Sequence, residues 1–266
     1  MISATSLRAV WNFRGFVLGS IRREFQLRYR GAVLGLAWAA IQPLAMILIY
    51  TVIFSQVMNA KLPGAEGAFS YGIYLCAGIV TWGLFAETVQ RGQSIFLDNA
   101  NLLKKLSFPR LTLPVIVAGF TLANFSIAFG LFLIFLLLTG NFPGLVVLAV
   151  IPLVVVQMLF ALGLGIALGV FNVFLRDTGQ ISGLVLQFWF WATPIVYPVS
   201  ILPDWMRSWM SLNPMFHLVT AYQQIFVARE WPEWNGVLLV GCFAVGIALY
   251  ALGLFRRKVG EIVDQL

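Results

Sequence analysis

The sequence predicts an all-α integral membrane protein with six transmembrane helices, and two observations carry this prediction. The chain has 266 residues, of which 61% are hydrophobic and 10% are charged, whereas a typical soluble domain is roughly 25% charged. Several nearly uncharged stretches also reach the length of about 20 residues that a helix needs to cross the hydrocarbon. Such a chain cannot cover a soluble surface, so we expect one compact membrane domain.

Six apolar runs predict the transmembrane helices, and local helix breakers separate them. The breakers include Pro63-Gly64, the run from Asn141 to Gly144, and Arg176-Asp177. The predicted spans lie near residues 32–58, 71–89, 111–139, 145–174, 179–199 and 236–255. They form a transmembrane domain over residues 32–255, between an N-terminal segment 1–31 and a C-terminal tail 256–266.

The distribution of basic residues predicts that both ends of the chain lie in the cytoplasm, because cytoplasmic loops collect Lys and Arg. With the N-terminus inside, only Lys61, Arg207 and Arg229 of the 17 basic residues fall outside, together with four carboxylates. The net charge of +7 then faces an anionic leaflet and does not indicate a nucleic-acid partner. We expect contact with membrane lipids and no nucleic acid.

The segment from Leu7 to Arg30 predicts an amphipathic helix that lies on the membrane. At 100° per residue most of its charges point away from an apolar face. That face consists of Leu7, Val10, Val17, Leu18, Ile21 and Phe25. Arg14 and Arg28 sit within the apolar stripe, where an arginine can reach up to lipid phosphates. For Arg28 and Arg30, at the turn into the first span, the alternative is a phosphate-bearing substrate.

The cytoplasmic loop from Gly92 to Arg110 predicts a short helix that ends before Pro109. Its apolar residues lie roughly on one side: Ile95, Phe96, Leu102, Leu103 and Leu106. The segment is too basic and too short to span a membrane, so it suits docking in a groove on another protein. A helix that rests on the bilayer is the equal alternative.

The external stretch from Trp191 to Pro214 predicts a re-entrant hairpin or a pair of short helices over the exit. Its prolines break the helix near the outer face, and tryptophans favour the interface. Non-helical backbone at this depth must be buried in protein or line a wet cavity, which indicates a gate. The aromatic run beside it, Phe188-Trp189-Phe190-Trp191, offers flat faces on which a ligand can stack, or it is the usual interfacial belt.

Small residues in the fourth run, Gly163, Gly165 and Gly169, predict close helix packing, because they lie inside a span and not in a nucleotide-binding turn. Cys76 and Cys242 lie singly in apolar runs, and His217 has no neighbouring ligands in the sequence. We therefore expect packing roles for the cysteines and no metal site.

Three sequence motifs occur in order among the six predicted spans. The first is residues 28–35 (RYRGAVLG) with Trp38 and Pro43, the second residues 101–110 (NLLKKLSFPR) with Leu113-Pro114, and the third residues 193–197 (TPIVY) with Leu212-Asn213-Pro214. Together they resemble the membrane subunits of ABC-2-type polysaccharide exporters, which include the Wzm O-antigen permeases and the capsule and teichoic-acid exporters. Ala32 and Gln223 depart from the family pattern, where Ser and Arg are common. The resemblance covers nearly the whole chain.

The resemblance implies the permease subunit of an ATP-driven exporter that moves lipid-linked polysaccharide of the O-antigen type across the bacterial inner membrane. It implies a homodimer, two ATP-binding cassette subunits and an undecaprenyl-pyrophosphate-linked glycan as partners. The substrate would enter near Arg28, Tyr29, Arg30, Gly31, Leu34, Gly35 and Trp38. The coupling helix, seated in the ATPase, would use Ile95, Phe96, Asn101, Leu102, Leu103, Lys104, Lys105 and Leu106. The channel or periplasmic gate helices would use Phe188, Trp189, Trp191, Pro194, Tyr197, Trp205 and Trp209.

The energy source is expected on a partner chain, because this sequence has no Gly-x-x-x-x-Gly-Lys-[Ser/Thr] phosphate loop. We therefore expect no enzyme activity and no cofactor on this chain, with ATP and Mg bound by the partner ATPase. A secondary transporter would need ionisable residues deep in the membrane. The nearest candidate, Glu87, has Arg91 four residues later, which favours an ion pair over a proton relay.

Two other classes of function stay open at this point. One is an ABC-2 exporter of teichoic acid, capsule or a small hydrophobic molecule, which would have the same fold. The other, less favoured, is a glycan-modifying membrane enzyme, which requires convergent acids, bases or metal ligands. The external loops offer only scattered carboxylates for that role, Glu66, Asp204, Glu230 and Glu233.

Overall fold

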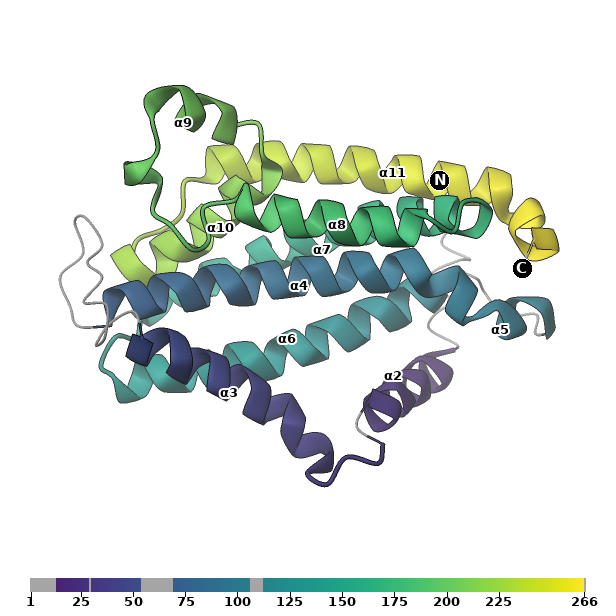
Figure 1. The fold of residues 1–266 in the computed structure, drawn as a ribbon, viewed down its shortest axis with the longest axis horizontal. Coiled ribbons are helices and arrows are strands. Elements are labelled where there is room, and N and C mark those ends of the chain that lie inside the picture. The colour runs from purple at the N-terminus through teal and green to yellow at the C-terminus, as the bar shows by residue number, and fades with distance from the viewer. Residues whose placement is uncertain (1–12, 29, 54–68, 106–111, 266) are drawn as a thin grey trace.

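A computed structural model describes residues 13–28, 30–53, 69–105 and 112–265, and these residues form helices joined by turns, with no strand among them (Figure 1). The predicted all-α class is confirmed. Within these described residues, five helical segments are long and apolar enough to cross a membrane: Gly35–Ile53, Ser70–Asp98, Thr112–Leu138, Gly144–Phe174 and Trp234–Gln265. Of the predicted site residues, Tyr29 and Leu106 lie outside the described part of the chain.

Helix α4 (Ser70–Asp98) is the central element of the bundle. It packs against α7 (Val150–Phe174) and α6 (Thr112–Leu138), and α7 in turn packs along α11 (Trp234–Gln265). Helix α3 (Trp38–Tyr50), preceded by the 3₁₀ turn η1 (Gly35–Ala37), lies against α6 and α4. The 3₁₀ turn η3 (Gly144–Ala149) leads into α7. Most residues of α4 are buried, so this helix carries the core of the domain.

Glycines allow α4 and α7 to approach each other closely, as the sequence predicted for Gly165 and Gly169. A Cβ atom on Gly165 would lie 3.1 Å from the Cα atom of Gly92, and one on Gly169 would lie 2.6 Å from the carbonyl oxygen of Gly92. A Cβ atom on Gly163 would lie 2.9 Å from the backbone nitrogen of Ala248 in α11. The prediction of close helix packing is confirmed at all three positions.

The fifth predicted span, residues 179–199, is not one continuous helix. Helix α8 (Thr178–Trp191) has 14 residues, or about 21 Å at 1.5 Å per residue, while the hydrocarbon core is about 30 Å thick. It ends before Pro194 because a residue that precedes proline is disfavoured in the α conformation. By length, the described part of the chain therefore contains five helical segments that can span a membrane, and α8 is shorter than these.

Short helices follow α8, as the sequence predicted for the external stretch. They are the 3₁₀ turn η4 (Val199–Ile201), α9 (Asp204–Met210), α10 (Pro214–Gln223) and the π-helical turn η5 (Gln224–Ala228). Helix α9 stands off from the bundle, whereas α10 packs on α4 and α11 (Figure 1).

Other helix boundaries differ from the predicted ones at three places. Helix α3 begins six residues after the predicted start at residue 32, because the chain turns at Gly31 and Gly35, whose φ angles are +81° and +50°. Helix α4 continues nine residues past residue 89, to Asp98. Helix α11 continues through the predicted tail to Gln265.

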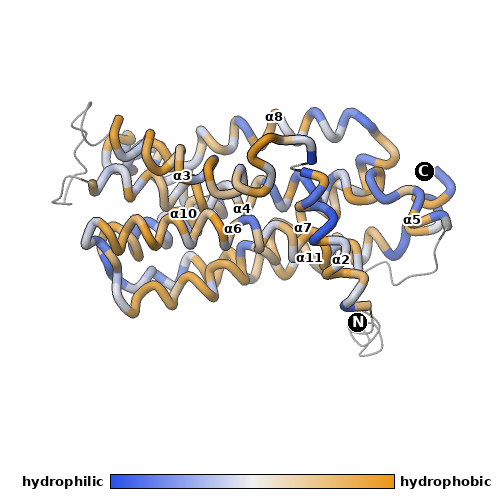
Figure 2. Tube along the Cα trace, turned by 90° about the horizontal axis from the view of Figure 1, so that it is seen from below, coloured by the Kyte–Doolittle hydropathy of each residue, from blue (hydrophilic) through white to orange (hydrophobic). Residues whose placement is uncertain are grey.

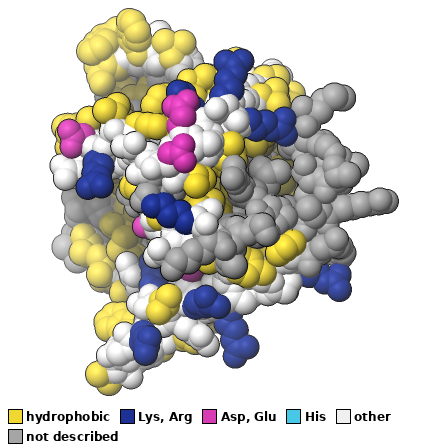
Figure 3. All heavy atoms as spheres, turned by 90° about the vertical axis from the view of Figure 1, so that its right-hand side faces the viewer, with side chains coloured by type: hydrophobic (Ala, Val, Ile, Leu, Met, Phe, Trp, Pro, Cys, Tyr) yellow, Lys and Arg dark blue, Asp and Glu magenta, His cyan; other side chains and the backbone are white. Residues whose placement is uncertain are grey.

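Polar and apolar residues are distributed unevenly along the bundle. Apolar residues cover most of the length of the long helices, and hydrophilic stretches gather toward the end that carries α5 (Ala100–Lys105) and the C-terminus (Figure 2). Viewed onto that end, Lys and Arg side chains are spread over the surface among fewer carboxylates (Figure 3). The same end holds helix α2 (Arg14–Arg28) (Figure 1).

Candidate functional site

Helix α2 packs on α6 through residues spaced one turn apart. Val17 is buried, the Ile21 side chain fills the space over Gly119, and the ring of Phe25 lies 4.4 Å from that of Phe120 between centroids. Leu18, which the sequence analysis placed on the same apolar face, is 66% exposed. The helix therefore lies on the protein through a narrow stripe and leaves other apolar residues outside.

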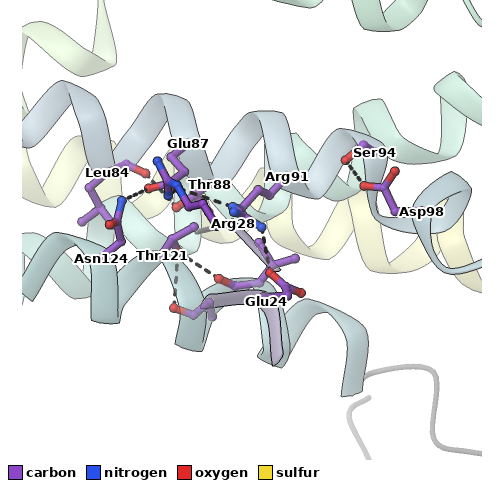
Figure 4. A network of polar contacts seen from close by, with 12 residues as sticks. Glu24, Arg28, Leu84, Glu87, Thr88, Arg91, Ser94, Asp98, Thr121 and Asn124 are labelled. Atoms are coloured by element: carbon purple, nitrogen blue, oxygen red, sulfur yellow. Dashed lines mark hydrogen bonds and ion pairs between the residues drawn. The ribbon is translucent and has the colours of Figure 1, made fainter. Parts of the chain in front are cut away.

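An ion-pair network joins α2 to α4 and α6 (Figure 4). Arg28 Nη1 donates to Glu87 Oε1 at 2.8 Å, and Arg91 Nε lies 3.4 Å from the same oxygen. Asn124 Nδ2 donates to Glu87 Oε2 at 2.6 Å, and Arg91 Nη1 donates to Glu24 Oε2 at 2.7 Å. The predicted Glu87–Arg91 ion pair is confirmed, and Glu87 is also held by two further donors.

The network is balanced in charge and only partly exposed to solvent. Two arginines face two glutamates, and the four side chains keep between 22% and 34% of their surface exposed. The guanidinium of Arg91 also lies over the ring of Phe120, at 3.7 Å from its centroid, a cation–π contact. Burial raises the pKa of the Glu24 carboxyl, and Arg91 opposes this shift without cancelling it.

Two hollows meet at Arg28. The first, here named the α3 hollow, has a volume of about 210 Å³ between α3, α4 and α6, and Arg28, Glu87 and Asn124 lie among its mostly apolar lining. The second, the α5 hollow, has about 520 Å³ between α2, α4, α5 and α6, with Arg23, Glu24, Arg28, Arg91 and Asp98 in its lining. An anionic group at Arg28 would thus contact an apolar space and a charged one.

The structure brings only part of the predicted substrate set into this site. Arg28 is in the network, whereas Arg30, Gly31, Leu34 and Trp38 are exposed and Gly35 is half-buried on the turn into α3. Sequence reasoning missed Glu24, Phe120 and Asn124. Glu24 precedes Arg28 by one helical turn, which is a signal for a shared face, and Asn124 is a polar residue in an otherwise apolar run.

The residues predicted to bind a partner separate into core and surface. Ile95 and Phe96 belong to α4 and are 2% and 1% exposed, and Phe96 stacks on Phe255 of α11 with centroids 5.1 Å apart. In α5, Leu103 is buried and Leu102 is half-buried, while Asn101 and Lys104 are exposed. The exposed surface of this segment is therefore polar, and its apolar residues attach it to the bundle.

The non-helical segment after α8 is buried, and side chains of α4 and α10 bond its carbonyl groups. Thr193 and Ile195 have no exposed surface. The Tyr74 hydroxyl lies 2.9 Å from the carbonyl oxygen of Pro194 and 2.8 Å from that of Tyr197, so its single proton is shared between them. Tyr71 donates to Val196 O at 2.6 Å, and Gln223 Nε2 donates to Pro194 O at 3.2 Å.

Asn213 connects this segment to the start of α10 through hydrogen bonds. Its side-chain oxygen caps α10 by accepting from the backbone N–H of Met215 at 3.0 Å, and it accepts from Trp189 Nε1 at 2.8 Å. Its amide nitrogen donates to Thr193 Oγ1 at 3.0 Å. The predicted motif of residues 212–214 is thus explained by an N-cap Asn followed by Pro at the first helical position, a favoured pairing.

The aromatic residues near this segment also divide into core and surface residues. Trp189 packs edge-on against Trp82, Phe85 and Phe160 in the core. The exposed members are Phe188, Trp191, Trp205 and Trp209, and Tyr197 is half-buried. Trp189, Trp205 and Trp209 line a hollow of about 470 Å³ between α8, α9 and the start of α10. Pro194 is buried below them.

His217 has a structural environment. Its Nε2 atom lies 2.8 Å from the carbonyl oxygen of Ser211, and its ring occupies the space over Gly236. Among the described residues, no three His, Cys, Asp or Glu side chains are grouped as metal ligands. The ring of His217 is therefore held by a hydrogen bond and by packing against α11.

Comparison with known proteins gives consistent matches over most of the chain. The family model described as ABC-2 type transporter matches residues 17–227. An O-antigen export system permease of Myxococcus xanthus is 31% identical over 98% of both chains. An O-antigen export system permease of Klebsiella pneumoniae is 27% identical over 90% of this chain and 86% of its own length. A polysialic acid transport protein of Escherichia coli is 19% identical over 89% of this chain and 90% of its own.

Proposed function

The chain belongs to the ABC-2 type transporter membrane family, and we propose that it is the permease subunit that exports a lipid-linked polysaccharide of the O-antigen type. Membership of this family implies an ATP-binding partner subunit. In this proposal two such subunits hydrolyse ATP. The permease is a homodimer in the bacterial inner membrane, and both ends of its chain lie in the cytoplasm.

The observation that carries the proposal is the end-to-end likeness to an O-antigen permease, at 31% identity over 98% of both chains. A likeness that covers nearly the whole of both chains supports a shared arrangement of helices. The more distant capsule-type relative, at 19% identity, favours O-antigen over capsule as the substrate class.

The geometry supports a place for the substrate phosphate. Arg28 lies at the junction of an apolar and a charged hollow, and guanidinium groups are the side chains best suited to phosphate oxygens. A lipid-linked glycan joins an apolar chain to a hydrophilic polymer through phosphate. Its three parts therefore match the apolar hollow, Arg28 and the charged hollow in that order. We propose that the substrate head approaches Arg28 near the turn that holds Gly31, Leu34 and Gly35.

The surface of α5 supports docking to the ATPase. Helix α5, whose residues Asn101 and Lys104 are exposed, lies at one end of the bundle (Figure 1). Its contacts with α4 and α11 hold it there. A rigidly attached short helix transmits a push from a partner better than a loose one. We propose that α5 is the coupling helix, acting through its polar surface and through the neighbouring residues Lys105 and Leu106.

One face of α8 supports pairing with a second copy. The side chains of Ile181, Leu184, Val185 and Phe188 are exposed on this helix, while Ser182 and Leu186 face the core. We propose that this face borders the glycan path in the dimer, with Phe188 and Trp191 as weak stacking surfaces. The segment around Pro194 and Tyr197 and helix α9, with Trp205 and Trp209, would form the gate.

A substrate-stimulation experiment tests the proposed function. The permease is reconstituted with its ATPase subunits, and ATP hydrolysis is measured with lipid-linked glycan and with hydrophobic drugs. We expect stimulation by the glycan alone. Stimulation by drugs and not by glycan would contradict the proposal in favour of a small-molecule exporter, and glycan turnover without ATP would favour an enzyme.

A variant on α5 tests the coupling role in the same assay. Lys104→Glu reverses an exposed charge on the docking surface and should lower both ATPase association and glycan export. Arg257→Glu, which reverses an exposed positive charge on α11, is the matched control. Glycan export that persists after ATPase association is lost would contradict ATP coupling through this chain.

A further inference from the structure

Glu87 occupies the position in which an anionic ligand would meet Arg28 and Arg91. One of its oxygens faces both arginines, at 2.8 Å and 3.4 Å, and the other accepts from Asn124 at 2.6 Å. Three donors from three helices therefore converge on a single carboxylate. Such a convergent set of donors is also what a phosphate group requires.

The surroundings of Glu87 specify the kind of ligand. The α3 hollow adjoins it on one side, with a lining that includes Met46, Ile47, Val80 and Leu84, and the α5 hollow adjoins Arg28 on the other, with Arg23 and Arg91. Met46 is 38% exposed, so the α3 hollow opens at the outer surface of the bundle. The α3 hollow, the carboxylate position of Glu87 and the α5 hollow thus follow one another as an apolar space, an anion position and a charged space.

We propose that the α3 hollow and the Arg28–Arg91 pair bind a prenyl diphosphate lipid, and that Glu87 is the internal carboxylate which the diphosphate displaces. The proposal rests on the proposed function and extends it to a defined site. Asn124 then donates to a phosphate oxygen in place of Glu87, and Glu24 holds Arg91 in position during the exchange.

Charge balance explains why a diphosphate fits better than a single phosphate diester. With Glu24 and Glu87 in place, the two arginines are neutralised within the protein. A phosphodiester headgroup exchanges one negative charge for one, so it gains little over Glu87. A diphosphate would place one phosphate group on Arg28 and Asn124 in place of Glu87 and a second one toward Arg23 and Arg91 in the α5 hollow, so it gains contacts that a single phosphodiester does not.

The size of the α3 hollow limits what enters it. Its volume of about 210 Å³ is about seven times the share of one water molecule in the liquid. This is room for the chain segment next to the head and not for a whole lipid tail. The remainder of the prenyl chain would lie along the exposed apolar side chains of α3, such as Leu44 and Leu48.

Binding measurements on the complete transporter test the proposal. The permease with its ATPase subunits is placed in phosphatidylcholine nanodiscs and titrated with a fluorescent prenyl diphosphate. Glu87→Gln should bind about tenfold more tightly, because the competing charge is gone, and Arg28→Gln and Arg91→Gln about tenfold more weakly. Arg22→Gln is the matched control, since Arg22 is exposed on α2 and lines neither hollow.

A second variant tests the hollow without changing any charge. Met46→Trp narrows the α3 hollow from a partly exposed position and should weaken binding of the prenyl diphosphate. Binding of inorganic pyrophosphate, which has no chain, should be unchanged in this variant. Unfolding temperatures of all variants are measured in parallel, so that loss of fold is recognised.

The proposal is overturned if Glu87→Gln does not tighten binding, or if Arg22→Gln weakens it as much as Arg28→Gln does. If these substitutions change the binding of phosphatidylglycerol as much as that of the prenyl diphosphate, the site binds bulk phospholipid, and the proposal is also overturned. If lipid-linked glycan still stimulates ATP hydrolysis in these cases, only the site is rejected. If stimulation is absent as well, the proposed function itself fails.

Discussion

Helix α4 takes part in two polar regions that are built from opposite chemistry. In its first turns, the neutral hydroxyls of Tyr71 and Tyr74 bond carbonyl groups of the segment from Pro194 to Tyr197. In its later turns, Glu87 and Arg91 form ion pairs with Glu24 and Arg28 of α2. We call these the tyrosine region and the charged region.

The difference between them suggests different tasks. Neutral bonds to buried carbonyls stabilise one fixed path of an irregular backbone, because an unpaired carbonyl in such a place is costly. Ion pairs that keep about a third of their surface exposed contribute little to stability, but their partners can be replaced by another ion. The tyrosine region thus suits a rigid support for the gate, and the charged region suits exchange with an anionic substrate.

The largest loss in the free energy of unfolding is expected when one hydroxyl is removed from the tyrosine region. Tyr74→Phe keeps the ring and leaves the carbonyl of Tyr197 without the proton that Tyr74 supplies, at a cost of about 1–3 kcal/mol. Unfolding in detergent and hydrogen exchange of the N–H groups of Ile195 and Val196 would measure this. Tyr250→Phe, at a site that is 58% exposed, is the control. Unchanged exchange in Tyr74→Phe would show that the hydroxyl is not a support.

A neutral residue at position 87 should loosen the charged region by a smaller amount. Glu87→Gln removes the ion pairs with Arg28 and Arg91 while it keeps an oxygen and the shape, so we expect a loss of about 0.5–1 kcal/mol. Hydrogen exchange should rise in α2 and stay constant in residues 193–198. A rise in both regions would mean that they are one cooperative unit and would remove the basis of the comparison.

The two regions should also respond differently to salt. Raising the salt concentration from about 0.1 M to about 1 M shortens the Debye length from about 10 Å to about 3 Å, which weakens partly exposed ion pairs. We expect faster exchange in α2 at high salt by a few-fold and no change at Ile195 and Val196. An equal response of the two segments would indicate that α2 is held by its apolar contacts, such as Phe25 on Phe120.

The smallest effect is expected from the titration of Glu24. Burial raises the pKa of Glu24 above its ordinary value, so folding favours its protonated form. The stabilising contribution is complete below the pKa of the unfolded chain, about 4.3, and is lost as the pH rises through the raised value. Wild-type protein should therefore lose slightly more stability than Glu24→Gln between about pH 4 and about pH 7, measured by thermal unfolding. A steeper loss in Glu24→Gln would contradict this assignment.

Long apolar runs and breakers were sufficient to predict most of the fold. The third and fourth runs match α6 and the η3–α7 pair within about one residue, because nothing within them competes with the hydrophobic pattern. The prediction that the fifth run forms one continuous helix was wrong. The apolar composition extends past Trp191, but Pro194 does not allow the helix to continue. Composition does not distinguish a buried non-helical segment from a spanning helix.

The site was less predictable, because its contacts connect distant parts of the sequence. Glu87 and Arg91 are four residues apart and were paired correctly. The contribution of Glu24 and Asn124 depends on how α2 and α6 lie beside α4, and no local pattern contains that information. Likewise, Ile95 and Phe96 have the helical spacing of a docking face, and the structure places them in the core only because α4 continues past residue 89 to meet α7 and α11.

A structure of the transporter with bound lipid-linked glycan tests the central claim most directly. The account predicts phosphate oxygens at about 3 Å from the guanidinium groups of Arg28 and Arg91, with Glu87 moved away from Arg28 and the first part of the lipid chain in the α3 hollow. A glycan lipid bound elsewhere, with the Arg28–Glu87 pair still closed at its present 2.8 Å, would contradict it.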